Sequence, residues 1–183
     1  MNIRTKSIYP YAGTINSVDL FGYVSHGVPG LEIVGMGKHS RGIKEKFIYL
    51  TRELHLKLPK RRFVLCVEGE IEGKKFKNDE FRYLELPMLL MLWSLSGHLP
   101  FKNLEDCFSS GKVSIDGQIE PYELTLEFQE KIPEILDLDS EDSLKIITTN
   151  EIKILDDFYH ISVEEIFNSL KLLGESEGSV TKI

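Results

Sequence analysis

Runs of β-branched and aromatic residues alternate with turn-forming residues in the first part of the chain. Such runs over 3–8 and 14–24, separated by the Tyr-Pro-Tyr-Ala-Gly segment at 9–13, predict a β-hairpin. A second turn at 27–30, Gly-Val-Pro-Gly, precedes a third predicted strand at 31–34. The amino-terminal part is therefore expected to be β-rich.

The next apolar residues recur at helical spacing and predict an amphipathic helix over 38–56. These residues are Ile43, Phe47, Leu50 and Leu54. The continuous apolar run at 63–67 is typical of a strand that is covered on both faces. Residues 69–82 are rich in charge and contain two glycines, which indicates a solvated hairpin or a mobile loop.

A stretch at 84–96 is apolar nearly all round and predicts a buried central helix, with Gly97 suited to its C-terminal cap. Residues 108–119 predict a hairpin, because Asp116-Gly117 is a strong two-residue turn signal.

The carboxyl-terminal third is predicted to contain a strand at 144–148, a short helix at 150–156 and an amphipathic helix at 163–173. No linker is long enough to separate two domains, so residues 1–173 are expected to form one domain. The polar tail at 174–183 is expected to be frayed and disordered.

Composition adds few constraints. With 42% apolar and 28% charged residues among 183, it is ordinary for a soluble globular protein. No stretch approaches the roughly 18 to 20 apolar residues that span a bilayer, and the amino terminus lacks the apolar core of a signal peptide. No membrane contact is therefore expected. The net charge of −7 argues against broad binding of nucleic acid but leaves room for a local basic patch.

The two cysteines and five histidines suggest neither metal nor thiol chemistry. The cysteines form no closely spaced ligand pattern, which favours a reduced, cytoplasmic setting. Cys66 lies in an apolar run, where a thiol behaves as a small apolar group rather than a nucleophile. The histidines show no HxxxH or HExxH spacing, so no metal site and no cofactor are expected.

One segment could bind a nucleotide, the Gly-Met-Gly-Lys-His-Ser run from Gly35 to Ser40 between a predicted strand and a predicted helix. A P-loop would need glycine at the position of Glu32 and Ser or Thr at that of His39. A dinucleotide-binding turn would need a third glycine at the position of Ser40, although Glu68 could then act as the ribose-binding acid. The alternative is a tight turn whose glycines admit close strand–helix packing, with Ser40 or a neighbour capping the helix.

Positive charge is concentrated before the strand at 63–67 and in the loop after it. If the loop folds back near residue 60, the two clusters form one patch that can contact phosphates. Acidic residues within 69–82 dilute the field, so a solvated strand entrance is the alternative. Lys57 belongs to the first cluster, and the candidate nucleic-acid contacts are Lys60, Arg61, Arg62, Lys74, Lys75 and Lys77.

Five segments, in the right order, resemble the amino-terminal domain of ComM-type proteins, also called YifB or magnesium-chelatase-like (ChlI) proteins. They are VSHGVPGLEIVGMG at 24–37, LPKRRFVLCV at 58–67, LELPMLLMLWSLSGHLP at 84–100, SSGKVSIDGQIEP at 109–121 and the segment at 144–170, which resembles the strand–helix–strand–helix unit that closes the family's domain. Typical family sequences to which they are similar include SNGLPGLTIVGLP and DLPIALGILAASGQIP. The resemblance covers nearly the whole chain.

The resemblance implies an α/β (α+β) fold in which helices pack on a mixed β-sheet, like the Lon proteolytic domain and the second domain of a small-subunit ribosomal protein. Lon-type proteolysis uses a serine that a lysine activates. The register puts that serine near Arg82 and the lysine near Leu126, where this chain has neither. Because Walker motifs are also absent, neither a protease nor an ATP-driven motor is expected, and no catalytic residue is assigned.

The function implied by the resemblance is that of a non-catalytic accessory domain of bacterial type. Its relatives serve in AAA+ assemblies that process DNA in recombination or natural transformation. The expected partner is therefore a protein, such as an AAA+ ATPase, with weak contact to DNA. Two alternatives stay open: a nucleotide-binding or enzymatic domain that uses the turn from Gly35 to Ser40, and a degenerate Lon-like domain that grips peptides without cutting them.

Overall fold

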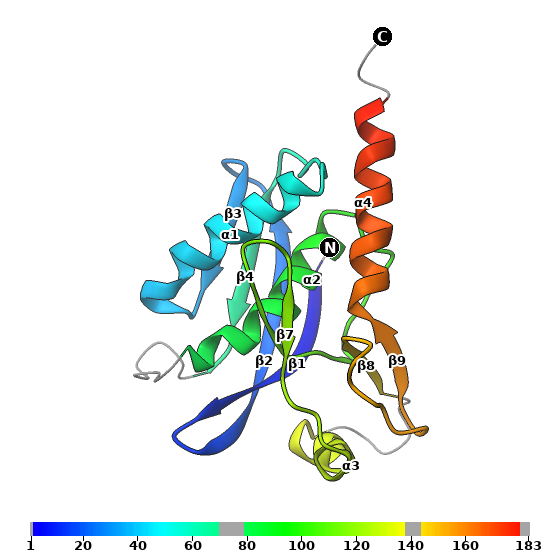
Figure 1. Cartoon of the computed structure of the whole chain (residues 1–183). Helices are drawn as coiled ribbons and strands as arrows, with labels where there is room; N and C mark the ends of the chain where they lie inside the picture. The colour runs from blue at the N-terminus through cyan, green and yellow to red at the C-terminus, as the bar shows by residue number, and fades with distance from the viewer. Residues whose placement is uncertain (1, 70–78, 138–143, 180–183) are drawn as a thin grey trace.

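A seven-stranded mixed sheet, with the strand order β3-β4-β2-β1-β5-β8-β9, forms the centre of the computed structural model (Figure 1). The structure describes residues 2–69, 79–137 and 144–179. β2 runs antiparallel to both of its neighbours, and the other neighbouring pairs are parallel. A separate two-stranded sheet pairs β6 with β7. The predicted α/β fold with helices on a mixed sheet is confirmed.

The strands are β1 (Asn2–Tyr11), β2 (Thr14–Ser25), β3 (Gly30–Val34), β4 (Arg62–Val67), β5 (Cys107–Phe108), β6 (Gly111–Val113), β7 (Ile119–Pro121), β8 (Lys145–Thr148) and β9 (Tyr159–Ser162). The helices are α1 (Ser40–Glu53), α2 (Glu85–Leu95), α3 (Leu126–Ile135) and α4 (Val163–Ser179). Two short 3-10 turns, η1 (Gly37–His39) and η2 (Glu80–Leu84), precede α1 and α2.

The amino-terminal hairpin is confirmed, with a continuous register that ends at Tyr11 opposite Thr14. Its two-residue turn is formed by Ala12 and Gly13, whose φ angles are 53° and 82°. Positive φ at both positions is what a type I′ turn requires, and the twist of such a turn matches that of the two strands. The predicted strands at 31–34, 63–67 and 144–148 are also confirmed, as β3, β4 and β8.

The predicted central helix is confirmed as α2, and all of its residues are buried. Trp93 donates a hydrogen bond from Nε1 to Thr51 Oγ1 of α1 at 3.0 Å. On the sheet side, a Cβ atom at Gly22 would lie 2.3 Å from Met91 Sδ, so β2 can approach this closely only with glycine there. Gly97 ends the helix with a φ of 84°, as predicted for the cap.

The two faces of the sheet carry separate hydrophobic clusters. Ile3 and Tyr9 of β1 belong to the larger cluster, which includes α1, α2 and residues of α4. Ile8 points to the opposite face, because successive side chains of a strand alternate, and it packs with Ile132 and Leu136 at α3. Figure 1 accordingly shows α1 and α2 lying across β1 to β4, with α3 apart from them at the bottom of the view.

The structure corrects the predicted short helix at 150–156, which consists of turns and irregular backbone. The side-chain amide of Gln129 in α3 forms hydrogen bonds with backbone groups of this segment that would otherwise be available for a helix. Its Nε2 donates to the Lys153 carbonyl at 2.8 Å, and its Oε1 accepts from the Leu155 N–H at 2.9 Å. α3 was not predicted, whereas β9 agrees with the second strand that the ComM-like resemblance implied before the last helix.

Two further boundaries differ from the prediction. The hairpin expected at 108–119 begins only at Gly111, because Phe108 lies in β5 and pairs with β1 and β8 instead. The last helix continues to Ser179, so 174–179 are helical although their composition indicated a frayed tail. Gly174, the first of these residues, lies against the Leu54 carbonyl at the end of α1.

Glu85, the first residue of α2, is 1% exposed and is surrounded by donors. Its carboxylate accepts hydrogen bonds from Lys46 Nζ at 2.6 Å, Arg82 Nε at 3.3 Å and Val113 N at 2.9 Å. Lys46 also donates to the Val113 carbonyl at 2.8 Å. One carboxylate therefore joins α1, η2 and β6, and a buried charge persists only with such partners.

Glu85→Ala is expected to lower the free energy of unfolding by about 3–5 kcal/mol, because it leaves two partly buried cations and a buried N–H without their acceptor. Urea unfolding followed by tryptophan fluorescence measures this loss. Glu127→Ala is the matched control, since Glu127 pairs with Lys131 on the exposed surface of α3, and little change is expected. Equal effects of the two substitutions would contradict the assigned role of Glu85.

Gly174→Ala is expected to destabilise the protein by about 1–3 kcal/mol, since overpacking forces a backbone shift. The added Cβ would lie 1.9 Å from the Leu54 carbonyl oxygen. Gly42→Ala in α1 meets no atom within 4 Å. This control should stabilise by about 0.5–1 kcal/mol, the usual gain for alanine over glycine in a helix. Thermal unfolding of both variants tests the contact, and stabilisation by Gly174→Ala would refute it.

Candidate functional site

A groove of about 460 Å³ lies between the start of β3, the second half of α1 and the connection from α1 to β4. Its apolar lining, which forms the floor, consists of the buried Leu31, Leu56 and Phe63, the half-buried Ile48 and Leu58, and the exposed Pro29 and Pro59. Its rim is basic and exposed, and consists of Arg52, Lys57, Lys60 and Arg61. We call this feature the basic groove.

The end of α1 creates the basic groove. The Leu56 N–H bonds the Thr51 carbonyl at 3.0 Å, and the His55 N–H bonds the Arg52 carbonyl at 2.8 Å. With a φ of 57° at His55, this is a Schellman motif, which ends a helix and reverses the chain. Leu56 is thereby buried in the core, and the basic residues after it are brought back toward the sheet.

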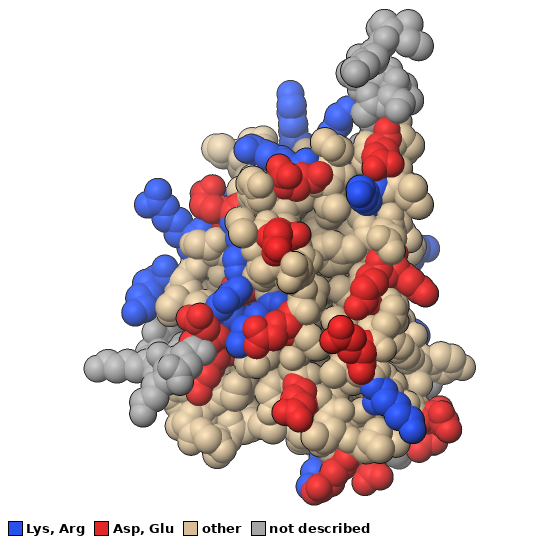
Figure 2. All heavy atoms as spheres, in the orientation of Figure 1, with Lys and Arg blue, Asp and Glu red and all other residues tan. Residues whose placement is uncertain are grey.

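The charge around the groove contrasts with that of the whole chain. Residues 38–62 contain nine Lys or Arg and two Asp or Glu, whereas the chain has a net charge of −7. The rest of the molecule is therefore strongly acidic. Figure 2 shows this polarity, with most Lys and Arg spheres of that view over α1 and its neighbourhood and Asp and Glu spread over the α3 and α4 side. An anionic ligand is accordingly attracted to one side.

The structure brings together only part of the predicted phosphate-binding patch. Lys60 and Arg61 line the groove with Lys57. Arg62 points to the other face of the sheet, where its guanidinium pairs with Glu32 of β3 and lies 3.5 Å from Ser25 Oγ. The remaining candidates, Lys74, Lys75 and Lys77, fall outside the described residues.

Arg52 is a rim residue that the sequence did not indicate. The helical pattern of the sequence places Arg52 among several charged residues on the solvated face of α1. The available signal was the basic excess across 38–62, which becomes a site only when the chain reverses at His55.

The turn from Gly35 to Ser40 is held by internal contacts. Gly35 has a φ of 88°, and a Cβ atom there would lie 2.4 Å from the Val67 carbonyl oxygen. The His39 N–H bonds the Met36 carbonyl at 3.1 Å, and the Ser40 N–H bonds the Gly37 carbonyl. Because these amide groups have internal acceptors, the geometry favours the packed turn over a phosphate cradle.

The details of this turn differ from the prediction in one respect. Neither η1 nor α1 has a side-chain cap, so the expected capping by Ser40 or a neighbour is wrong. The His39 ring stacks on Phe81 at a centroid distance of 3.8 Å. The pKa of His39 is lowered, first by burial and then by Lys38, which favours the uncharged ring.

The positions at which a Lon-type dyad would lie hold other structures. Arg82 donates from Nη2 to the Val113 carbonyl at 2.8 Å and contacts Glu85. Leu126 begins α3, whose lysine, Lys131, pairs with Glu127 at 2.7 Å on the surface. Arg82 therefore contributes to the buried ion network described above.

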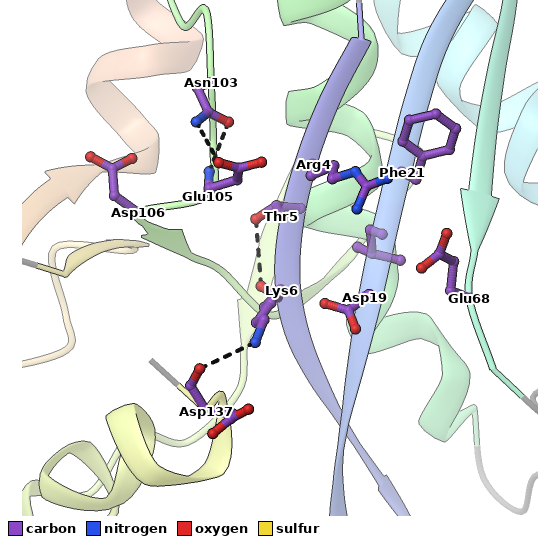
Figure 3. Close-up of a pocket in the computed structure, with 11 residues that line it drawn as sticks. Arg4, Thr5, Lys6, Asp19, Phe21, Glu68, Asn103, Glu105, Asp106 and Asp137 are labelled. Atoms are coloured by element: carbon purple, nitrogen blue, oxygen red, sulfur yellow. Dashed lines mark hydrogen bonds between the residues drawn. The ribbon is translucent and has the colours of Figure 1, made fainter. Parts of the chain in front are cut away.

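A second and larger hollow, of about 580 Å³, lies beside β1 and β2 (Figure 3). Its cations are engaged within the fold: the Arg4 guanidinium carbon lies 5.3 Å from the centre of the Phe21 ring, and the Lys6 ammonium bonds the carbonyls of Leu136 and Asp137. Its other charged lining residues are acidic, namely Asp19, Glu68, Glu105, Asp106 and Asp137. This hollow repels anions, so the smaller basic groove is the better candidate for them.

Neither cysteine has the properties of an activated thiol. Burial, then Asp106, raises the pKa of Cys107 to about 12. The pKa of Cys66 is also raised, by burial and then by Glu68 and Glu32. Within the described ranges, no three His, Cys, Asp or Glu side chains are grouped so that they could hold a metal ion. Nor does any described helix have the length and apolarity needed to cross a membrane.

No model of a known protein family matches the chain, and no curated protein matches it.

Cys107 is expected to resist thiol reagents in the folded protein. With a pKa of about 12, its thiolate fraction at pH 8 is roughly one in ten thousand. Ellman's reagent should therefore label the half-buried Cys66 slowly and Cys107 only after urea is added. Cys66→Ser serves as the control, since it removes the slow native phase and leaves the urea-dependent one. Rapid labelling of Cys107 in the folded protein would contradict the burial that sets its pKa.

Proposed function

We propose that the chain is a non-catalytic, ComM-like accessory domain that recognises a partner protein in an AAA+ DNA-processing assembly of the bacterial cytoplasm. The proposal also includes weak contact with DNA through the basic groove. The observation that supports it most is the basic excess of residues 38–62 around a groove with an apolar floor. The resemblance of five segments to ComM-type proteins is the basis for proposing an AAA+ assembly, and the groove is the proposed binding site for a ligand.

The DNA contact is expected to be weak and independent of base sequence. The rim offers the cations Arg52, Lys57, Lys60 and Arg61, and the acidic remainder of the chain repels a long polyanion. The one aromatic residue that lines the groove, Phe63, is 1% exposed and cannot stack on a base. Contacts to phosphates fix position but read no sequence.

The apolar floor favours a polypeptide as the principal ligand. Leu56 and Leu58 offer a phosphate no favourable contact, whereas an apolar side chain of a partner protein that leaves water there makes the free energy of binding more favourable. This feature also fits the peptide-gripping alternative. Both hypotheses place a protein segment in the groove.

The DNA part is tested by fluorescence anisotropy with single-stranded and branched DNA at about 50 and about 200 mM salt. If about three phosphates are contacted, affinity should fall about 20- to 40-fold between the two conditions. The double substitution Lys60→Glu/Arg61→Glu should abolish binding at the lower salt concentration. Lys102→Glu is the control, because it makes the same kind of charge change at an exposed residue outside the groove.

Absence of binding at low salt would remove the DNA part. The partner part is tested by sedimentation of the protein with a purified AAA+ module of a ComM-type protein. If neither DNA nor that module binds, the proposed function is wrong.

A further inference from the structure

β3 is the end strand of the sheet, so one of its edges pairs with no strand in the described part of the chain. The Gly30 N–H bonds the Arg61 carbonyl at 3.0 Å, on the side of β4. Because backbone groups alternate along a parallel strand, those of Leu31 and Ile33 point to the outer edge. An edge with free N–H and C=O groups is a template for one more strand.

A helix lies beside this edge. Ile48 and Arg52 of α1 line the same groove as Leu31, and Lys44 lies one turn earlier on the same stripe of the helix. Ile48 is partly buried, and Arg52 is exposed. Leu31 of β3 and two residues of this stripe, Ile48 and Arg52, thus lie on the basic groove together. Strand addition beside a helix is a recurring mode of peptide recognition.

The charges select the kind of peptide. Arg52 and Arg61 line the basic groove, and Lys44 lies one turn before Ile48 on the same helix. The acidic residue of β3, Glu32, faces the other side of the sheet and is paired with Arg62. A bound strand would therefore meet cations and an apolar floor. Because alternate side chains of a strand share one face, the acidic residues of a strand in which acidic and apolar residues alternate can all face these cations.

Nucleic acid fits the β3 edge and the basic groove less well. It has no peptide N–H and C=O groups to pair with the outer edge of β3, and the groove offers no exposed aromatic ring.

We infer that the outer edge of β3, with Lys44, Ile48 and Arg52 of α1, binds an extended acidic–apolar segment of the partner protein as an added strand. The inference rests on the proposed function and names the chemistry of the partner.

The test uses a labelled synthetic peptide of about eight residues, in which Glu alternates with Val or Leu, a length typical of a strand. It should bind the full chain, and Arg52→Glu/Arg61→Glu should weaken binding by at least about tenfold, since rim charges attract the ligand. Lys102→Glu should leave binding unchanged. A peptide with Lys in place of Glu should bind the charge-reversed variant better than the wild type.

Hydrogen exchange distinguishes strand addition from loose attraction. Bound peptide should slow exchange at the amides of Leu31 and Ile33, and that of Gly30, which is already bonded, should change little. Peptide binding without protection at Leu31 and Ile33 would overturn the inference, and so would the absence of peptide binding. If the peptide fails while DNA or the AAA+ module binds, this inference is wrong and the proposed function stands.

Discussion

The helix α2 has no side that faces water, and the other elements are arranged to cover it. The sheet covers it through the close approach at Gly22, α1 through the Trp93–Thr51 hydrogen bond, and α4 through the edge-to-face contact of Trp93 with Phe167. An apolar helix is stable in water only when it is enclosed in this way. Its one charged residue, Glu85, is neutralised by cations from α1 and η2, so the same burial that drives folding also fixes how these elements meet.

The basic groove is a consequence of how α1 packs. Because Phe47 and Leu50 of α1 enter the core, the opposite and lateral faces of the helix remain for charged residues. The reversal at His55 then returns the chain toward β3, so that Lys60 and Arg61 line the same groove as Arg52. The side of α1 that packs in the core and the side that lines the basic groove thus belong to one helix. An unpaired sheet edge is a template for further strands, and the cations near this edge are the reason why an acidic strand is proposed as its ligand.

Periodic patterns predicted the elements whose burial is decided locally. The hairpin, β3, β4, α2 with its Gly97 cap, and β8 follow from alternation, continuous apolar runs and turn residues. The errors occur where distant contacts decide the backbone. Gln129 holds 150–156 out of a helix, Leu54 accompanies the continuation of α4 past 173, and Phe108 is drawn into the large sheet by β1 and β8.

The sequence by itself determined that the chain forms strands and helices around an apolar helix, and that its cations cluster before β4. It did so because hydrophobic spacing and charge are properties of neighbouring residues. Only the tertiary structure decided which cations line the same groove. Arg62 pairs with Glu32 on the other face of the sheet, whereas Arg52, which lies before the loop that leads to β4, lines the groove together with Lys60 and Arg61. Adjacent side chains of a strand point to opposite faces of the sheet, and a chain reversal after a helix brings residues that are distant in sequence close together in space.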